Sequence, residues 1–209
     1  MALPQEKLLY SVDEYLEMER AAVERHEYID GHVYAMAGES LEHSTIITNM
    51  IALLVTQLRG KACRTLSPEM KIRSGPYIKE QKTNKGMYSY ADLTVVCGEP
   101  KFHDKFRDVL LNPRVIIEVL SPSTGSFDQS TKFLRYRANI DTFREYVLVW
   151  QTAPMIVVYS RQGNDWLMSD YHGLDAVLYL PSIDCRLPLR EIYDRVTFPE
   201  PEEEGEEAV

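Results

Sequence analysis

The sequence predicts one α/β domain built around buried central strands. The chain has 209 residues, of which 44% are hydrophobic, and this is enough to fill one sizeable core. Two runs, Asp92–Val96 and Val115–Leu120, are dense in β-branched residues, which is typical of strands covered on both faces. A loop and a predicted helix at Phe127–Arg137 follow the second run, in the order of a crossover unit. We expect residues 1–198 to form this domain.

The N-terminal region carries two local signals. The residues from Ser11 to Glu14 form a capping box, which predicts a short helix that continues to about Met18. Asp30-Gly31 is the strongest short hairpin signal and joins two alternating segments, so it predicts a β-hairpin with Glu27 on its first strand. The two segments are Arg25–Ile29 and His32–Met36.

A long helix is predicted from Leu41 to Arg59, ending near Gly60. Its apolar residues recur at steps of three and four, the period of one helix face. These residues are Ile46, Ile47, Met50, Ile51, Leu54, Val55 and Leu58.

The remaining elements are shorter. The polar, Lys-containing segment Ser74–Ser89 is predicted to be a surface loop. Strands are predicted at Ala62–Leu66, Glu69–Arg73, Tyr146–Trp150, Met155–Tyr159 and Trp166–Tyr171, followed by an apolar stretch at Ala176–Leu180 and a helix at Leu189–Asp194.

The net charge of −9 is concentrated at the C-terminus. Removing the six glutamates that follow Pro199 leaves −3 for the rest of the chain, which can still carry a basic face. The charge therefore neither supports nor excludes a nucleic-acid partner. Residues 199–209 are predicted to be a disordered acidic tail, because so Glu-rich a segment cannot bury enough apolar area.

The cysteines and the hydropathy indicate the compartment. Cys63, Cys97 and Cys185 are odd in number, far apart and without metal-ligand spacing, so we expect reduced, mostly buried thiols. No apolar run is long enough to span a membrane, and the N-terminus lacks the features of a signal peptide. We therefore expect a cytoplasmic protein with no membrane partner.

Asp92 and Glu118 stand in the two central strands, where apolar residues would be expected. A buried carboxylate is costly unless a cation or several hydrogen bonds stabilise it. If the strands are neighbours in register, the two carboxylates converge as ligands for Mg²⁺ or Mn²⁺, and the backbone carbonyl of Val119 could add a further ligand. A nearby lysine could then orient or deprotonate an attacking water.

These residues also have purely structural alternatives. Asp92 could cap a loop or pair with an arginine, and Glu27 could pair across its hairpin. His43, near the start of the long helix, is a further candidate if it faces the cleft, although a lone helical histidine is more often packed or exposed. Glu118 could instead form a buried ion pair with Lys71, Arg73 or Lys132.

A basic segment forms a separate candidate interface. It contains few acids and could contact phosphates, or it could simply be a solvated loop. Its members are Lys71, Arg73, Lys79, Lys82 and Lys85.

The order of Tyr90–Asp92 and then Glu118–Leu120 resembles the split motif of the restriction-endonuclease-like nucleases, the PD-(D/E)XK superfamily. Ala91 replaces the proline of that motif, and Leu120 replaces its lysine. A bacterial restriction-endonuclease branch of the superfamily is similar to nearly the whole chain, over residues 10–195. The resembling segments are RHEYIDGHVYAMAG, YADLTVVCG, IIEVLSPST, FDQSTKFLRYRA and REYVLVW.

The resemblance implies a restriction-endonuclease-like core, with a mixed central β-sheet flanked by helices, and a divalent-metal nuclease site. In that branch the catalytic lysine lies on the helix after the strand, which maps to Lys132 here. Glu27 maps to an accessory carboxylate of the site. Asp92 and Glu118 would hold the metal ion while Lys132 positions the attacking water.

Two functions remain open at this point. The first is a metal-dependent DNA endonuclease, expected as a homodimer because cutting both strands needs two sites. The alternative is a catalytically inactive module of the same fold that binds DNA or protein. The sequence has no P-loop, dinucleotide-binding, zincin or nucleophile-elbow motif, which removes those enzyme classes.

Overall fold

The computed structural model describes residues 9–75, 84–121, 125 and 128–199. Its helical segments are α1 (Val12–Ala21), α2 (Leu41–Leu58), the π-helical turn η1 (Asp128–Lys132), α4 (Phe133–Asn139) and α5 (Leu189–Ile192). Its strands are β1 (His26–Ile29), β2 (His32–Ala35), β3 (Cys63–Leu66), β4 (Lys71–Ser74), β5 (Met87–Tyr90), β6 (Leu93–Cys97), β7 (Val109–Leu110), β8 (Val115–Leu120), β9 (Glu145–Trp150), β10 (Met155–Gln162), β11 (Asp165–His172), β12 (Val177–Leu180) and β13 (Cys185–Pro188).

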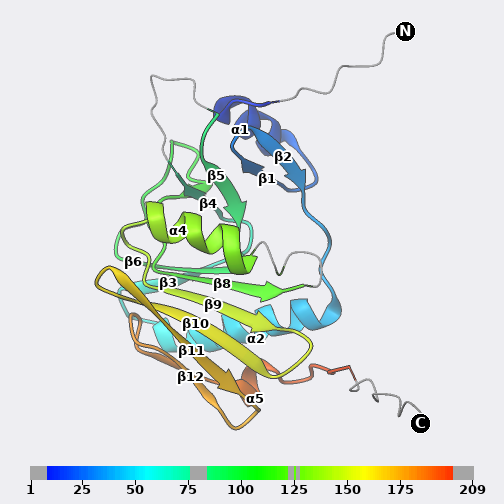
Figure 1. Cartoon of the computed structure of the whole chain (residues 1–209), viewed down its shortest axis with the longest axis vertical. Coiled ribbons are helices and arrows are strands. Elements are labelled where there is room, and N and C mark those ends of the chain that lie inside the picture. The colour runs from blue at the N-terminus through cyan, green and yellow to red at the C-terminus, as the bar shows by residue number, and fades with distance from the viewer. Residues whose placement is uncertain (1–8, 76–83, 122–124, 126–127, 200–209) are drawn as a thin grey trace, which may run out of the picture.

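The main sheet has six strands in the order β11-β10-β9-β8-β6-β3. β8 and β9 are parallel, whereas β6 lies antiparallel on the other side of β8. The chain between β8 and β9 passes through η1 and α4, which lie over one face of the sheet in Figure 1. A parallel pair needs such a crossover connection. The predicted α/β class, with its mixed sheet and crossover unit, is therefore confirmed.

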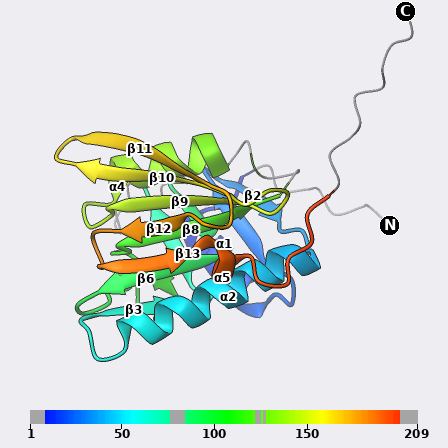
Figure 2. The same ribbon diagram turned by 90° about the horizontal axis from the view of Figure 1, so that it is seen from below.

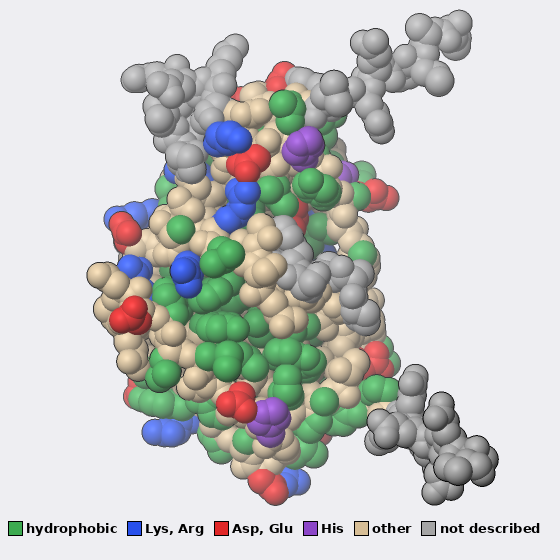
Figure 3. Space-filling model, viewed as in Figure 1, with side chains coloured by type: hydrophobic (Ala, Val, Ile, Leu, Met, Phe, Trp, Pro, Cys, Tyr) green, Lys and Arg blue, Asp and Glu red, His purple; other side chains and the backbone are tan. Residues whose placement is uncertain are grey.

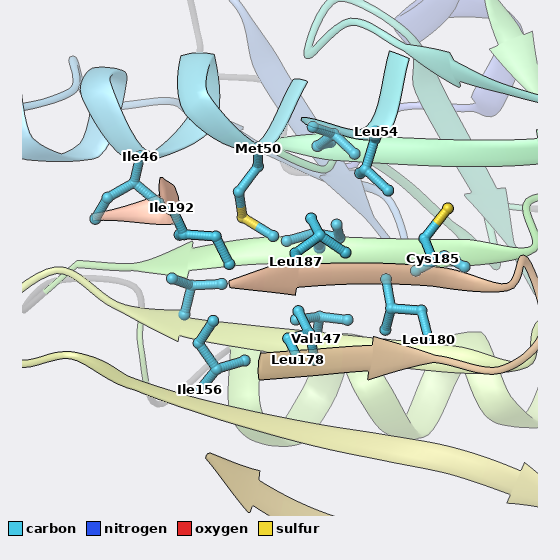
Figure 4. Packing of buried hydrophobic residues seen from close by; sticks show 14 of the residues in the cluster. Ile46, Met50, Leu54, Val147, Ile156, Leu178, Leu180, Cys185, Leu187 and Ile192 are labelled. Atoms are coloured by element: carbon cyan, nitrogen blue, oxygen red, sulfur yellow. The ribbon is translucent and has the colours of Figure 1, made fainter. Parts of the chain in front are cut away.

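One face of the main sheet packs against the predicted long helix, α2. Ile46, Met50 and Leu54 on α2 are buried against the sheet, with the spacing of one helix face. Figure 2 shows α2 running along the strands beside β12, β13 and α5, and Figure 4 shows Leu178 and Leu187 of β12 and β13 in the same core. No helix in the described ranges is long and apolar enough to cross a membrane.

The opposite face of the main sheet is covered by α4 and by a second sheet. Ile116 and Leu120 of β8 pack here against Phe133 and Tyr136 of α4. Side chains alternate along a strand, so Glu118, between Ile116 and Leu120, points to this face. β8 is thus covered on both faces, as its composition predicted.

The second sheet has the order β2-β1-β5-β4-β7 and carries the N-terminal elements. α1 begins with the predicted capping box, in which the side chain of each of Ser11 and Glu14 accepts a hydrogen bond from the backbone N–H of the other. The helix continues three residues beyond its predicted end. The predicted hairpin joins β1 and β2. Its turn requires positive φ at two positions, and Asp30 and Gly31 adopt 48° and 99°.

The prediction of a surface loop at Ser74–Ser89 is wrong at its C-terminal end. Met87–Tyr90 forms β5, whose four residues are all buried between β1 and β4. The polar Ser89 is accommodated because its hydroxyl is hydrogen-bonded to the Tyr136 hydroxyl at 2.9 Å. Residues 76–83 of the predicted loop lie outside the described residues.

Two further predicted elements are present but differ in helix type or in their bounds. The helix predicted at Phe127–Arg137 is a π-helical turn over Asp128–Lys132, followed by an α-helix that continues to Asn139. The predicted strand Asp92–Val96 begins one residue later, so Asp92 precedes β6. The short strands β7 and β13 were not predicted, because each depends on its pairing partner more than on its own sequence pattern.

The expectation of three reduced thiols is wrong for two of them. Cys63 and Cys97 face each other directly in the antiparallel pair of β3 and β6 and form a disulfide. Thirty-four positions separate them along the chain, so only the strand register brings them together. Cys185 is a free and buried thiol, as predicted.

The packed chain reaches Phe198, whose ring lies 5.4 Å from that of Tyr193. We therefore expect a variant ending at Phe198 to keep the free energy of unfolding of the full chain within about 0.5 kcal/mol, the usual range for changes that remove no packed group. Urea denaturation followed by circular dichroism measures this difference. A truncated chain that fails to fold would contradict the prediction that residues 199–209 are dispensable.

Candidate active site

Asp92 and Glu118 meet where β8 ends. β6 and β8 pair with Leu93 opposite Ile117, which brings the residue before β6 alongside Glu118. The Asp92 carboxylate accepts a hydrogen bond from the Val119 backbone N–H at 2.6 Å. Glu118 is 2% exposed on the face that α4 covers. The expectation that their strands are neighbours is therefore confirmed.

Lys132 enters the same region from the helical side. Lys132 is 5% exposed, and its ammonium nitrogen lies 3.4 Å from Glu118 Oε1. It also donates a hydrogen bond to the Tyr90 carbonyl oxygen at 3.2 Å. Lys132 is the last residue of η1, in the crossover connection between β8 and β9, and this connection lies over the face of β8 that carries Glu118.

Glu27 reaches the cluster from the second sheet. Its Oε1 lies 3.1 Å from Lys132 Nζ and accepts a hydrogen bond from the Tyr90 backbone N–H at 3.1 Å. β1 and β5 pair with Tyr28 opposite Tyr88, and Glu27, the residue before Tyr28, reaches the backbone of Tyr90 at the end of β5. The two sheets therefore contribute carboxylates to one ammonium group.

His43 lies at the edge of this cluster, on the first turn of α2. Its Nε2 is 3.0 Å from Asp92 Oδ2, and its Nδ1 is 3.5 Å from Glu39 Oε2. Burial lowers the pKa of His43, but the hydrogen bond and charge of Asp92 outweigh that effect and raise it overall. His43 thus contacts Asp92 from the α2 side.

Asp128 was not among the predicted site residues. It is 4% exposed, and its Oδ1 lies 3.1 Å from Lys132 Nζ. An acidic residue four positions before Lys132 was the signal available in the sequence, because residues at that spacing share a helix face. Tyr90 was also missed, since its contribution is made by backbone atoms.

Burial and crowding set the charge states in the cluster. Burial raises the pKa of Glu118 well above its usual range, and Asp128, Asp92 and Glu27 add to this rise while Lys132 opposes it. Burial acts to lower the pKa of Lys132, but Glu118 and the other carboxylates raise it well above the usual value. Among the described residues, three carboxylates therefore lie within 3.4 Å of the one ammonium of Lys132.

The donor set suits a divalent ion of the Mg²⁺ type. Asp92 and Glu118 supply hard carboxylate oxygens, and such ions are commonly bound by one or two carboxylates together with water and phosphate oxygens. Within the described ranges, no group of three or more His, Cys, Asp and Glu side chains is arranged so that it could hold a metal ion. A site at Asp92 and Glu118 would therefore use two carboxylates, with the Val119 carbonyl as the further candidate ligand.

Lys71 and Arg73, the other cations considered for Glu118, lie elsewhere. Lys71 Nζ is 3.2 Å from Asp108 Oδ2 and donates to the Tyr90 hydroxyl at 3.2 Å. Arg73 donates to the Gly75 carbonyl. In the predicted basic segment, Lys79 and Lys82 lie outside the described residues. Figure 3 shows several Lys and Arg side chains on the face of the molecule that carries α4.

Comparisons with known proteins agree with this fold. The model of the Uma2 family, described as "Putative restriction endonuclease", matches residues 12–190. The "Uncharacterized protein slr1290" of Synechocystis sp. is 34% identical over 189 residues, which cover 90% of this chain and 93% of that protein. The "Uncharacterized protein sll1609" of the same organism is 32% identical over 164 residues, covering 78% and 88% of the two chains.

A solved structure from Anabaena variabilis, described as "a putative nuclease belonging to DUF820", has the same fold. It superposes with a TM-score of 0.70 at 17% identity, over 88% of this chain and 97% of the other. The match of the family model over most of the chain and the two relatives above 30% identity show the family. The chain belongs to the Uma2 family of restriction-endonuclease-like proteins.

Proposed function

We propose that this protein is a metal-dependent endonuclease that hydrolyses phosphodiester bonds of DNA. The observation that carries the proposal is the buried ammonium of Lys132, 3.4 Å from Glu118, beside a strand end where Asp92 also lies. Burying so many ionisable groups is costly, and such clusters are found preferentially where chemistry needs them. Membership of the Uma2 family agrees with this choice.

Asp92, Glu118 and the Val119 carbonyl would hold Mg²⁺ or Mn²⁺. When bound, the ion supplies positive charge to the phosphate and makes a bound water more acidic. In the reaction, the water oxygen forms a bond to phosphorus as the bond from phosphorus to the leaving oxygen breaks. One proton leaves the water, and the leaving oxygen takes up a proton.

Lys132 is assigned to positioning the attacking water and to offsetting negative charge on the phosphate. It already donates to the Tyr90 carbonyl and to Glu118, so a donor role towards the attacking water and the phosphate needs no change in its chemistry. Glu27 holds the ammonium from the second sheet and would support the metal or a second ion. His43 would keep Asp92 oriented towards Val119.

DNA is the proposed substrate, and two copies of the chain would act on it when both strands are cut. Each strand needs its own cleavage event, which two sites related by a two-fold axis can supply. The Lys and Arg side chains on the α4 face could contact phosphates, and each such contact would make binding weaker at higher salt (Figure 3).

The test is nicking of supercoiled plasmid with Mg²⁺, with Mn²⁺ and with a chelator. We expect metal-dependent nicking by the wild type. Asp92→Ala should slow it at least about tenfold, because even a group that only supports a metal ligand is commonly worth that much. Asp170→Ala is the matched control, since Asp170 is an exposed aspartate paired with His172 on β11 and should leave the rate unchanged.

Wild-type protein that binds plasmid but never nicks it, with either metal ion, would favour the inactive DNA-binding module. Wild-type protein that neither nicks nor retards DNA would favour a protein-binding role. Equal nicking by wild type and Asp92→Ala would remove Asp92 from the site while leaving the nuclease activity itself established.

A further inference from the structure

The negative charge of Asp128 is stabilised by different partners from those of the other carboxylates around Lys132. Glu118 is a proposed metal ligand, and Glu27 accepts a hydrogen bond from the Tyr90 N–H. Among the described residues, Asp128 Oδ1 is buried and accepts no hydrogen bond of regular geometry. Its ion pair with Lys132 Nζ, at 3.1 Å, is therefore the main stabilisation that the structure gives this oxygen.

The backbone places Asp128 and Lys132 as one unit. They are the first and last residues of the π-helical turn η1, four positions apart. The Tyr146 hydroxyl on β9 donates to the Asp128 carbonyl oxygen at 2.9 Å, and Lys132 Nζ donates to the Tyr90 carbonyl on β5. The turn is thus fixed to both sheets, and π-helical turns occur frequently at functional sites.

The charges of Asp128 and Lys132 compensate each other inside the site. A divalent cation held by Glu118 would share the charge of that carboxylate and repel the ammonium 3.4 Å away. The ammonium of a lysine that is only 5% exposed is costly to keep in place without a compensating charge. Asp128 lies beside Lys132 and is not one of the proposed metal ligands, so it can provide that charge throughout the reaction.

We propose that Asp128 is a positioning residue for Lys132: it keeps the ammonium at the active site when a divalent cation takes up the charge of Glu118. The proposal rests on the proposed nuclease function. It concerns how the lysine is held, and Asp128 itself contacts neither the metal ion nor the DNA.

The test is a double-variant cycle with Asp128→Asn, Lys132→Met and the two changes together. Asn keeps the shape of Asp and an oxygen acceptor but loses the charge. We expect Asp128→Asn to lower kcat about tenfold, the lower end of the range for groups that orient an active-site residue, with KM for DNA unchanged. In the Lys132→Met background the same change should have no further effect on kcat, because Asp128 acts through the lysine.

Asp108→Asn is the matched control. Asp108 pairs with another buried lysine, Lys71, at 3.2 Å and also accepts hydrogen bonds from Arg20, and within the described ranges these partners are not proposed site residues. The control should leave kcat and KM unchanged. If Asp128→Asn does not fold, Asp128→Ser takes its place, since it also removes the charge and is smaller.

A second readout needs neither DNA nor metal. Urea unfolding of the same four proteins in chelator should show that Asp128→Asn costs less stability in the Lys132→Met background than in the wild type. Equal costs in both backgrounds, or wild-type kcat in the single variant, would overturn the proposal. If the wild type does not cleave DNA at all, the nuclease function fails, and this is seen before any variant is compared.

Discussion

Glu118→Gln is expected to fold normally and to cleave DNA on the order of 10³-fold more slowly than the wild type. The substitution keeps the shape of a side chain that is 2% exposed, so the packing of β8 against α4 is preserved. It removes the charge that would attract the metal ion and also the charge 3.4 Å from Lys132. Losing one preorganised electrostatic group typically costs 10²- to 10³-fold, and Glu118 serves two partners.

Calorimetric titration with Mg²⁺ and single-turnover cleavage measure the two parts of this effect. Both metal affinity and cleavage should fall together, while the circular dichroism spectrum remains that of the wild type. Glu145→Gln is a matched control, because Glu145 is a buried glutamate that pairs with Ser182 at the far end of β9. An unchanged Mg²⁺ titration for Glu118→Gln would remove this residue as a ligand.

Lys132→Ala is expected to lower the cleavage rate about 10²-fold or more at saturating metal, with DNA affinity nearly unchanged. The ammonium would act on the transition state, so its loss should appear in kcat and not in KM. Lys132→Arg should not rescue the rate fully, because a planar guanidinium cannot replace a compact ammonium among three close carboxylates.

The same variant should lose stability in the absence of metal. Removing one partner of a buried ion pair costs on the order of 3–5 kcal/mol, and here the remaining groups are Glu27, Glu118 and Asp128. Urea unfolding in chelator should show this loss, and added Mg²⁺ should recover part of it by binding the folded state. Lys132→Ala that cleaves plasmid at the wild-type rate would require another residue to position the water.

Much of the fold could be predicted because its signals are local. The capping box at Ser11 and the Asp30-Gly31 turn each specify a conformation within a few residues, and both were found where expected. The period of three and four along α2 defines its buried face in the same way. The composition of β8 indicated a strand with both faces covered, which left Glu118 as the residue to be explained.

The elements that escaped prediction depend on distant partners. β5 contains the polar Ser89, and the strand is buried because β1 and β4 flank it and Tyr136 is hydrogen-bonded to Ser89. The disulfide between Cys63 and Cys97 depends on the register of β3 and β6, which the spacing of the cysteines does not reveal. Tertiary pairing of this kind overrides local propensity.

The site residues likewise fall into those that the sequence predicted and one that only the structure reveals. Asp92 and Glu118 were predicted from their positions in buried strands, and Lys132 and Glu27 from the family resemblance. The structure places Glu27 and Glu118 against Lys132, and Asp92 against the backbone of Val119. Asp128 belongs to no motif that was considered. Its burial becomes evident only once the π-helical turn places it against Lys132.

Glu27 and Glu118 belong to different sheets yet share one ammonium, which makes the site a joint between two layers of the molecule. Local opening of a protein can separate such layers at a smaller free-energy cost than global unfolding. The smaller sheet is held on the main sheet by a buried cluster in which Ile72 and Met87 of β4 and β5 join Ile116 and Leu148 of β8 and β9. Under the proposed function, cleavage would require the two layers to stay packed together, because each contributes a carboxylate to Lys132.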